Sequence, residues 1–190
     1  ATEVCAGLAF SAIQNNDKVG LLLFSDHVEA VIPPKKGRSH VLRIIRDVLN
    51  AHPTGKGTNI REALHYVNRL LNRRSIVVVA SDFQDSGYEK ELRMTRGLHD
   101  LICLQIEDKA EKTLPDMGLL PVKHPETGET QWLDTSSKRV RAEHEASYVR
   151  LQNSLETMFL RMKLDTIRIN TNDSYVKPLV SFFQRRIHRG

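Results

Sequence analysis

The feature that most constrains the fold is an alternation of short apolar runs with longer amphipathic segments. Three runs, 19–24, 76–80 and 101–106, are apolar or nearly so throughout and have the length of a strand. Strands buried on both faces have this composition, and parallel sheets covered by helices are built from them. Between these runs, apolar residues recur at helical spacing. The pattern predicts an α/β fold with a mostly parallel sheet, helices on both faces and right-handed crossovers.

Turn and capping residues set the expected boundaries of the other elements. A strand over 28–32 should stop at Pro33 and Pro34, which cannot donate to a ladder. Ser39 is the expected N-cap of the helix that follows. Further helices are predicted over 1–16, 60–71, 89–98, 140–162 and 174–188, with a late strand over 166–169.

A turn-rich stretch between two short apolar segments predicts a β-hairpin. The segments are 119–122 and 131–133, with Pro125 to Gly128 between them. We place this hairpin as an insertion over about 117–135 in a single domain that covers residues 1–190, since 190 residues suffice for one substantial core. Leu155, Met158, Phe159 and Met162 form an apolar stripe on the next helix, and we interpret this stripe as core.

Sequence composition bears on the cellular location of the chain and on the state of its thiols. No apolar run approaches the roughly 20 residues that span a bilayer, and no signal peptide is recognisable, so we predict a cytoplasmic protein without membrane contact. Cys5 and Cys103 lack metal-ligand or redox spacing, which predicts reduced, buried thiols. The first helix begins without a cap or an initiator Met, so we expect a fragment of a longer protein.

Polar residues follow several of the predicted strands and should meet at one edge of the sheet. Ligands of open α/β sheets bind at the carboxyl ends of the strands. Each polar group also has a structural explanation: Asp82 could cap a helix N-terminus, Thr58 or Asn59 could be an N-cap, and Ser25 with Asp26 is ordinary turn chemistry. The candidate residues at this edge are Ser25, Asp26, Thr58, Asn59, Ser81, Asp82 and Asp85.

Several segments together resemble the bacterial family catalogued as domain of unknown function 58, which contains a von Willebrand A-like domain. They occur in the expected order and cover most of the chain. These segments are 16–25, Ile32-Pro33-Pro34, Gly37-Arg38, Gly57-Thr58-Asn59, Arg73-Arg74-Ser75, Ser81-Asp82-Phe83, His99-Asp100, Leu114-Pro115 and 126–129.

The resemblance implies a Rossmann-like fold and a metal-ion-dependent adhesion site, in which three loops and a partner's carboxylate hold Mg²⁺ or Mn²⁺. Thr58 matches the family's threonine loop and Asp82 its aspartate loop. The first loop, Asp-x-Ser-x-Ser after a central first strand, should precede Ala1 and is missing. Because Mg²⁺ prefers octahedral oxygen coordination, we expect no tight metal site in this chain. Strands 19–24 and 76–80 should either close the gap or leave it for another chain.

These observations favour a non-catalytic, protein-binding adaptor over two alternatives. The resemblance suggests a MoxR-type AAA+ ATPase as the partner, in assembly or chaperone-like processes. One alternative is a hydrolase built on Asp82 and His99, which requires convergent side chains. The other is nucleic-acid binding by the basic C-terminal helix, which requires Arg185, Arg186 and Arg189 in one exposed stripe. A sheet without its central strand could also form homo-oligomers to cover its edges.

Overall fold

The computed structural model describes residues 2–123 and 130–187. Its contacts divide the chain into two compact units, residues 1–104 (unit 1) and 105–190 (unit 2), which we describe separately. The division falls between residues 104 and 105, within a buried strand. The sequence analysis predicted a single domain. The α/β composition predicted from the alternation is confirmed.

An antiparallel hairpin opens the β-structure of unit 1. Strand β1 (Val19–Phe24) pairs with β2 (Val28–Lys35), from Val19 opposite Lys35 to Phe24 opposite Val28. The prediction that Pro33 and Pro34 end the second strand is wrong, because β2 continues through both prolines. Within residues 2–123 and 130–187, β2 pairs with β1 alone, and an outer edge tolerates residues that lack an N–H donor.

Strand β1 is less buried than its sequence predicted. Its apolar run indicated a strand buried on both faces, but none of its six residues is fully buried. Since β2 is the only partner of β1 in the described chain, one edge of β1 has no neighbouring strand. β1 and β3 (Ile76–Ser81) belong to different sheets, so these two strands do not close the gap that the resemblance implied.

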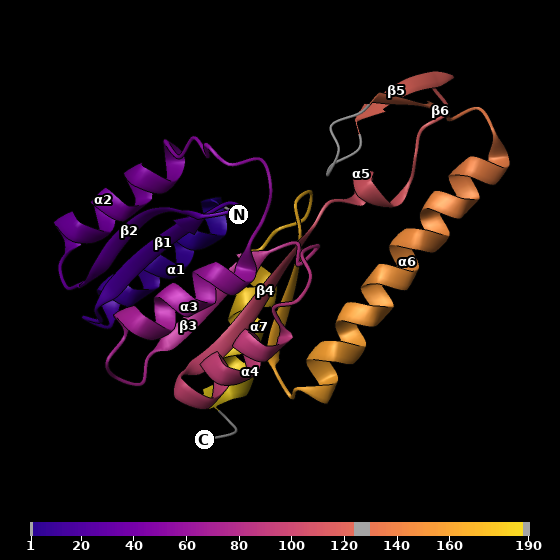
Figure 1. Cartoon of the computed structure of the whole chain (residues 1–190). Helices are drawn as coiled ribbons and strands as arrows, with labels where there is room; N and C mark the ends of the chain where they lie inside the picture. The colour runs from indigo at the N-terminus through magenta and orange to yellow at the C-terminus, as the bar shows by residue number, and fades with distance from the viewer. Residues whose placement is uncertain (1, 124–129, 188–190) are drawn as a thin grey trace. The chain divides into compact units, whose positions relative to one another are not determined.

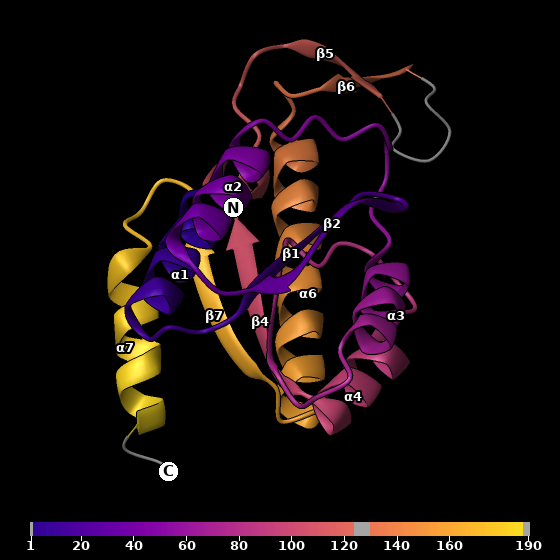
Figure 2. The same cartoon turned by 90° about the vertical axis from the view of Figure 1, so that its left-hand side faces the viewer.

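Four helices complete unit 1: α1 (Thr2–Gln14), α2 (Arg38–Leu49), α3 (Ile60–Leu70) and α4 (Glu89–Leu98). α2 and α3 lie on opposite sides of the β1–β2 hairpin (Figures 1 and 2). Ser39 is not the N-cap of α2 as predicted; Gly37, with φ 108°, takes that position, because its missing Cβ permits the left-handed entry. The buried apolar residues of these helices include Val4, Val41, Ile44, Ile60, Leu64 and Leu92.

A three-stranded parallel sheet has the order β3, β4 (Asp100–Glu107), β7 (Asp165–Asn170). The three strands match the predicted runs within two residues at each end. β4 is the central strand, and its residues 101–105 are all buried, as expected for an apolar run covered on both faces. Cys103 is a buried free thiol, whereas Cys5 is only half-buried, against the prediction that both are buried.

Unit 2 contains a second hairpin and the longest helix. β5 (Leu119–Lys123) pairs antiparallel with β6 (Thr130–Asp134), which confirms the predicted hairpin strands; its turn lies outside the described residues. Helix α6 (Lys138–Arg161) buries Leu155 and Phe159, and Met162 just beyond it is buried too, so the stripe is core as predicted. The short α5 (Lys109–Lys112) and the C-terminal α7 (Val176–Ile187) complete the unit.

Candidate functional site

Two hydrogen bonds bring together three loops of unit 1. The amide of Asn59 donates to the carbonyl of Ser25 at 2.7 Å, which ties the loop before α3 to the β1–β2 turn. The next amide, of Ile60, donates to Asp85 Oδ2 at 2.8 Å, which ties the same loop to the segment after β3. Three of the predicted edge positions therefore lie side by side.

Asn59, and not Thr58, caps helix α3. Asn59 Oδ1 accepts the amide of Glu62 at 3.0 Å, the usual geometry of an N-cap side chain. The Asp85 carboxylate adds a second acceptor at the same helix end, where the macrodipole favours a negative charge. Thr58 is exposed and precedes the cap, so its hydroxyl is not used as the N-cap of α3.

The Asp82 carboxylate accepts hydrogen bonds within its own turn. Its Oδ1 accepts Ser81 Oγ at 3.3 Å and the amide of Gln84 at 3.2 Å, and Ser81 Oγ accepts the amide of Phe83 at 3.1 Å. Such bonds to the backbone two residues ahead are typical of Asp and Ser in turns. The helix-capping role that we considered for Asp82 belongs to Asp85, three residues later.

Buried aromatic rings fix this turn. Phe83 is fully buried and has φ 59°, a left-handed conformation that is costly for a side chain with a Cβ. Tyr88, also buried, donates its hydroxyl to the carbonyl of Phe83 at 3.0 Å, with the two rings 6.1 Å apart. Burial raises the pKa of Tyr88 well above its ordinary value, so the phenol stays neutral and donates. The turn is therefore rigidly specified.

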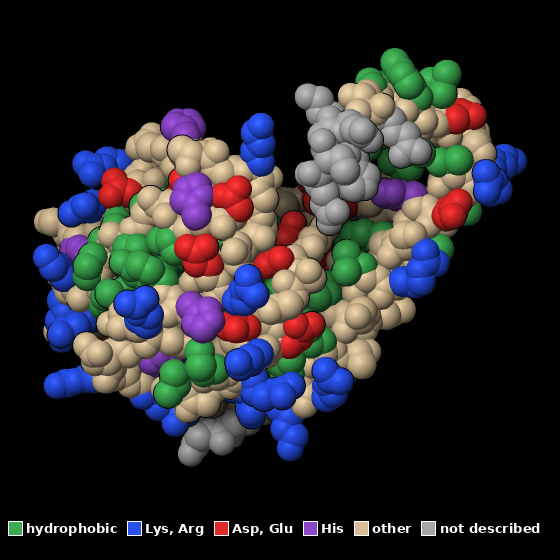
Figure 3. Space-filling view, in the orientation of Figure 1, with side chains coloured by type: hydrophobic (Ala, Val, Ile, Leu, Met, Phe, Trp, Pro, Cys, Tyr) green, Lys and Arg blue, Asp and Glu red, His purple; other side chains and the backbone are tan. Residues whose placement is uncertain are grey.

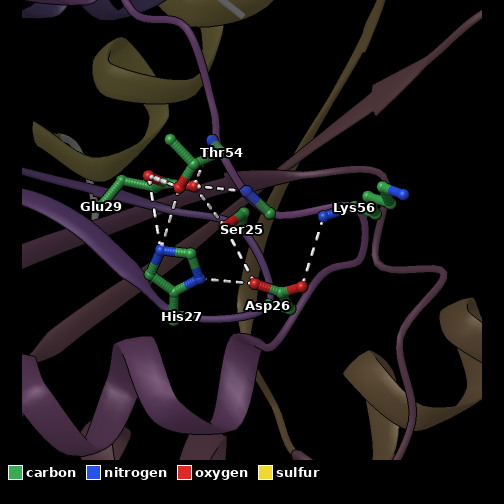
Figure 4. Close-up of polar contacts among 7 residues, drawn as sticks. Ser25, Asp26, His27, Glu29, Thr54 and Lys56 are labelled. Atoms are coloured by element: carbon green, nitrogen blue, oxygen red, sulfur yellow. Dashed lines mark hydrogen bonds and ion pairs between the residues drawn. The ribbon is translucent and has the colours of Figure 1, made fainter.

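A polar cluster, which we call the turn clamp, joins the β1–β2 turn to the loop before α3 (Figure 4). Glu29 Oε1 accepts Ser25 Oγ at 2.6 Å and the amides of Thr54 and Gly55 at 2.8 and 3.0 Å, while Oε2 accepts Thr54 Oγ1 at 2.8 Å. The turn clamp consists of Ser25, Asp26, His27 and Glu29, with residues 54–56 of the facing loop.

His27 lies between two carboxylates of the clamp. Its Nδ1 is 2.6 Å from Asp26 Oδ1, and its Nε2 is 3.5 Å from Glu29 Oε2 and 3.3 Å from Thr54 Oγ1. Histidine and acidic side chains lie next to one another on the visible face of unit 1 (Figure 3). Asp26 also accepts the amide of Lys56 at 3.3 Å. The imidazole therefore has acceptors at both ring nitrogens, which favours its charged form.

Hydrogen bonds shift Asp26, His27 and Glu29 toward their charged forms. The Ser25 hydroxyl, then the Gly55 amide, lower the pKa of Glu29 to about 2. The Asp26 carboxylate raises the pKa of His27, and the His27 ring in turn lowers the pKa of Asp26. Charged hydrogen bonds are stronger than neutral ones, so this small, partly buried cluster can order a loop.

Sequence reasoning missed His27, Glu29 and Thr54. A signal was present, because Glu29 is the only charged residue in the otherwise apolar stretch 28–34. A charged side chain within an apolar strand usually has a specific partner. Which loop supplies that partner is a tertiary fact that the local pattern does not contain.

The predicted edge residues differ in how far they face solvent. Asp26 and Thr58 are exposed, whereas Asn59, Ser81, Asp82 and Asp85 are half-buried. Ser25 is buried, and its hydroxyl bonds to Glu29. The surface available to a partner at this edge therefore centres on Asp26 and Thr58.

The predicted metal ligands do not make a complete site by themselves. Thr58 offers one hydroxyl, and Asp82 one carboxylate whose Oδ1 already accepts two bonds. Across the described ranges 2–123 and 130–187, no three His, Cys, Asp or Glu side chains group as metal ligands. Mg²⁺ takes six oxygen ligands, some of them water, so this donor set does not fit a tight site.

Two findings concern the residues on which the alternative functions were built. Among the described residues, neither buried ring nitrogen of His99 has a hydrogen-bond partner, so His99 does not form the bond to Asp82 that a hydrolase pair requires. Burial, then the charge of Arg74, lower the pKa of His99. In unit 2, Arg186 lies 5.6 Å from the Phe182 ring centroid and pairs with Asp165, which removes it from an exposed basic stripe; Arg189 lies outside the described residues.

Comparison with known proteins identifies the family. Residues 1–154 match the family described as protein of unknown function DUF58. The chain belongs to this family. An uncharacterized protein of Mycobacterium tuberculosis is 23% identical over 131 residues, which are 67% of this chain and 41% of that protein. An uncharacterized protein of Mycobacterium avium is 22% identical over 143 residues, 70% of this chain and 85% of that protein. The chain thus spans about 40% of the longer relative.

Solved structures support the fold of this DUF58 chain. A conserved hypothetical protein BatB from Bacteroides thetaiotaomicron superposes with a TM-score of 0.53 at 14% identity, covering 97% of this chain and 87% of that one. An aerotolerance-related membrane protein from Bacteroides fragilis gives 0.56 at 15% identity, covering 97% and 88%. At this identity the likeness concerns the fold alone. Among the residues described here, no helix has the length and apolar character needed to cross a membrane.

Proposed function

We propose that this DUF58 chain is a non-catalytic, protein-binding adaptor with a von Willebrand A-like fold. The binding surface is the loop edge formed by Asp26, Thr58 and the neighbouring Asp82 turn. The observation that carries the proposal is that three loops are tied together there while Thr58 stays exposed and outside the helix cap. A polar group that the fold does not use, on a rigid loop edge, is available to a partner.

The partner class that we propose is a MoxR-type AAA+ ATPase, on the basis of the family resemblance. The same resemblance suggests a divalent cation at this edge in the intact protein. Thr58 and Asp82 supply too few ligands for that cation, so the proposal for this chain rests on direct contact through the loops. Charge and hydroxyl groups at the rim of an interface mainly set specificity and association rate.

Binding to a purified MoxR-type ATPase from the same genome tests the proposal. Biolayer interferometry would compare the wild-type chain with Thr58→Ala and Asp26→Asn, and with Arg139→Ala on α6 as an exposed control in unit 2. We expect affinity to fall about fivefold for each edge variant, since truncating a contributing interface side chain costs about 1 kcal/mol. Equal affinity across the three variants would place the interface elsewhere, and no binding by any of them would reject the ATPase as partner.

A calorimetric titration with Mg²⁺ and Mn²⁺ tests the cation separately. The chain would be compared with a longer one that includes the upstream segment, each with and without Asp82→Ala. We expect heat of binding only from the longer chain with Asp82 intact. Binding by neither chain would mean that the edge acts without a metal.

A further inference from the structure

Hydrogen bonds to the β1–β2 hairpin position the loop that carries Thr58. Residues 51–59 contain no helix or strand, yet several of its backbone amides have acceptors on the β1–β2 hairpin. Glu29 accepts from Thr54 and Gly55, Asp26 from Lys56, and the Ser25 carbonyl from Asn59. A surface loop is normally among the least stable parts of a fold, so these bonds decide how well it is ordered.

Glu29 makes the largest share of these bonds. Oε1 receives one hydroxyl and two amides, and Oε2 receives the Thr54 hydroxyl. Its side chain is 14% exposed, so water has limited access to replace these donors. A neutral amide in its place would remove the charge and present an N–H₂ group toward either the amides or the Thr54 hydroxyl.

The loop and the turn approach too closely for any side chain at position 55. A Cβ built on Gly55 would lie 2.2 Å from Asp26 Oδ1 and 2.3 Å from Ser25 Oγ. The glycine therefore permits the approach on which the bonds of Glu29 depend.

The imidazole of His27 adds a charge that responds to the solvent. Its side chain is 48% exposed, and acidic groups face it from two elements: Asp26 and Glu29 on the hairpin and Glu62 on α3. The facing loop, residues 51–59, carries one Lys and no Arg: Lys56, whose backbone amide bonds to Asp26. Protonated His27 offsets this negative charge, whereas neutral His27 leaves the carboxylates uncompensated beside one another.

We propose that Glu29 is a positioning residue that fixes the Thr58 loop, and that protonation of His27 strengthens this fixation, so that the presented edge depends on pH. The link to partner binding rests on the proposed function; the ordering of the loop does not.

The pH window follows from the directions of the shifts. The pKa of His27 is raised from 6.5, so its contribution is complete below that value and is lost as pH rises through the raised pKa. The pKa of Glu29 is lowered from 4.5 to about 2, so its contribution is complete above 4.5 and is lost as pH falls toward 2. The loop should therefore be best ordered between these ranges, in mildly acidic solution.

Amide hydrogen exchange on the chain without any ligand tests the proposal. Exchange at residues 54–56 would be measured at about pH 5.5 and about pH 8, corrected for intrinsic rates, in wild type, Glu29→Gln and His27→Gln. Asp47→Asn is the matched control, because Asp47 is a carboxylate on α2 that pairs with Arg43 and Arg46. Unchanged exchange in α4 would show that unit 1 of each variant is folded.

We expect Glu29→Gln to lower protection of Thr54 and Gly55 about tenfold at both pH values, since hydrogen bonds to charged groups are the strong ones. Wild type should lose protection between the lower and the higher pH, and His27→Gln should remove that difference. Normal protection in Glu29→Gln would overturn the positioning role. A pH difference that persists in His27→Gln would overturn the role of the imidazole.

The same variants separate this inference from the proposed function. If Glu29→Gln loosens the loop while no ATPase binds the wild type, the clamp stands and the adaptor role fails. If the ATPase binds and Glu29→Gln neither loosens the loop nor changes affinity, the adaptor role stands and the clamp fails.

Discussion

The loop before α3 and the turn after β3 lie side by side, but different forces order them. The first is exposed and is attached to the hairpin by carboxylates that accept amides and a hydroxyl. The second is built on Phe83 and Tyr88, which are almost completely buried. Burial of aromatic area responds little to pH near neutrality, whereas hydrogen bonds between charged groups near the surface respond to pH and to screening by salt. The comparison suggests that the Asp82 turn has a fixed conformation, whereas the neighbouring Thr58 loop can adjust.

The largest expected effect is the loss of stability when the Asp82 turn loses a buried ring. Phe83→Ala removes a fully buried ring and should lower the free energy of unfolding by about 3–5 kcal/mol. Alanine gains nothing at φ 59°, so the strain remains. Urea unfolding measures the loss, with Phe10→Ala as control, because Phe10 is 51% exposed. Equal losses for the two variants would contradict a structural role of the Phe83 ring.

The second prediction concerns the close approach of loop and turn. Gly55→Ala should destabilise unit 1 by about 1–3 kcal/mol, because the new Cβ overlaps Asp26 and Ser25 and must push the loop away. Gly97→Ala on α4 is the control: no atom lies near its added Cβ, and alanine in a helix should stabilise by about 0.5–1 kcal/mol. Thermal unfolding measures the stability change of each variant and its sign. If Gly55→Ala leaves stability unchanged, the loop and the turn do not approach as closely as described.

Sequence patterns predicted most elements because their signals are local. The apolar run 101–106 gave a strand whose residues 101–105 are buried, and the segment 89–98 gave a helix with those bounds. The errors arose where a neighbour decides the outcome. β1 is apolar on both faces yet half-buried, since no strand of the described residues pairs with its second edge. Pro33 is tolerated because β2 is an edge strand of this two-stranded sheet.

The candidate site was predictable as a location but not as a network. The rule that strand ends meet at one edge placed Ser25, Asn59 and Asp85 together, as the structure does. It could not distinguish Thr58 from Asn59 as the cap, since both residue types are common at N-caps. Nor could it find Glu29, whose partners lie 25 and 26 residues along the chain.

A smaller effect separates the cap from the exposed hydroxyl beside it. Asn59→Ala should lower the free energy of unfolding by about 1 kcal/mol, because the Glu62 amide loses its acceptor. Thr58→Ala should change it by no more than about 0.5 kcal/mol, as for surface residues that the fold does not use. Chemical denaturation compares the two. The opposite ranking would make Thr58 the structural residue and remove the main support for a binding role.

The smallest effect is the response of the Asp82 turn to pH, and it sharpens the contrast with the turn clamp. Because burial raises the pKa of Tyr88, the folded state holds the phenolic proton more tightly than the unfolded state does. Stability from this residue is therefore complete below its ordinary value of 10 and declines as pH rises above it. Amide exchange at residues 83–88 should be constant, after correction, across the mildly acidic to neutral range in which residues 54–56 change. Tyr88→Phe should abolish the alkaline decline, and a change at 83–88 near neutral pH would mean that the two loops open together.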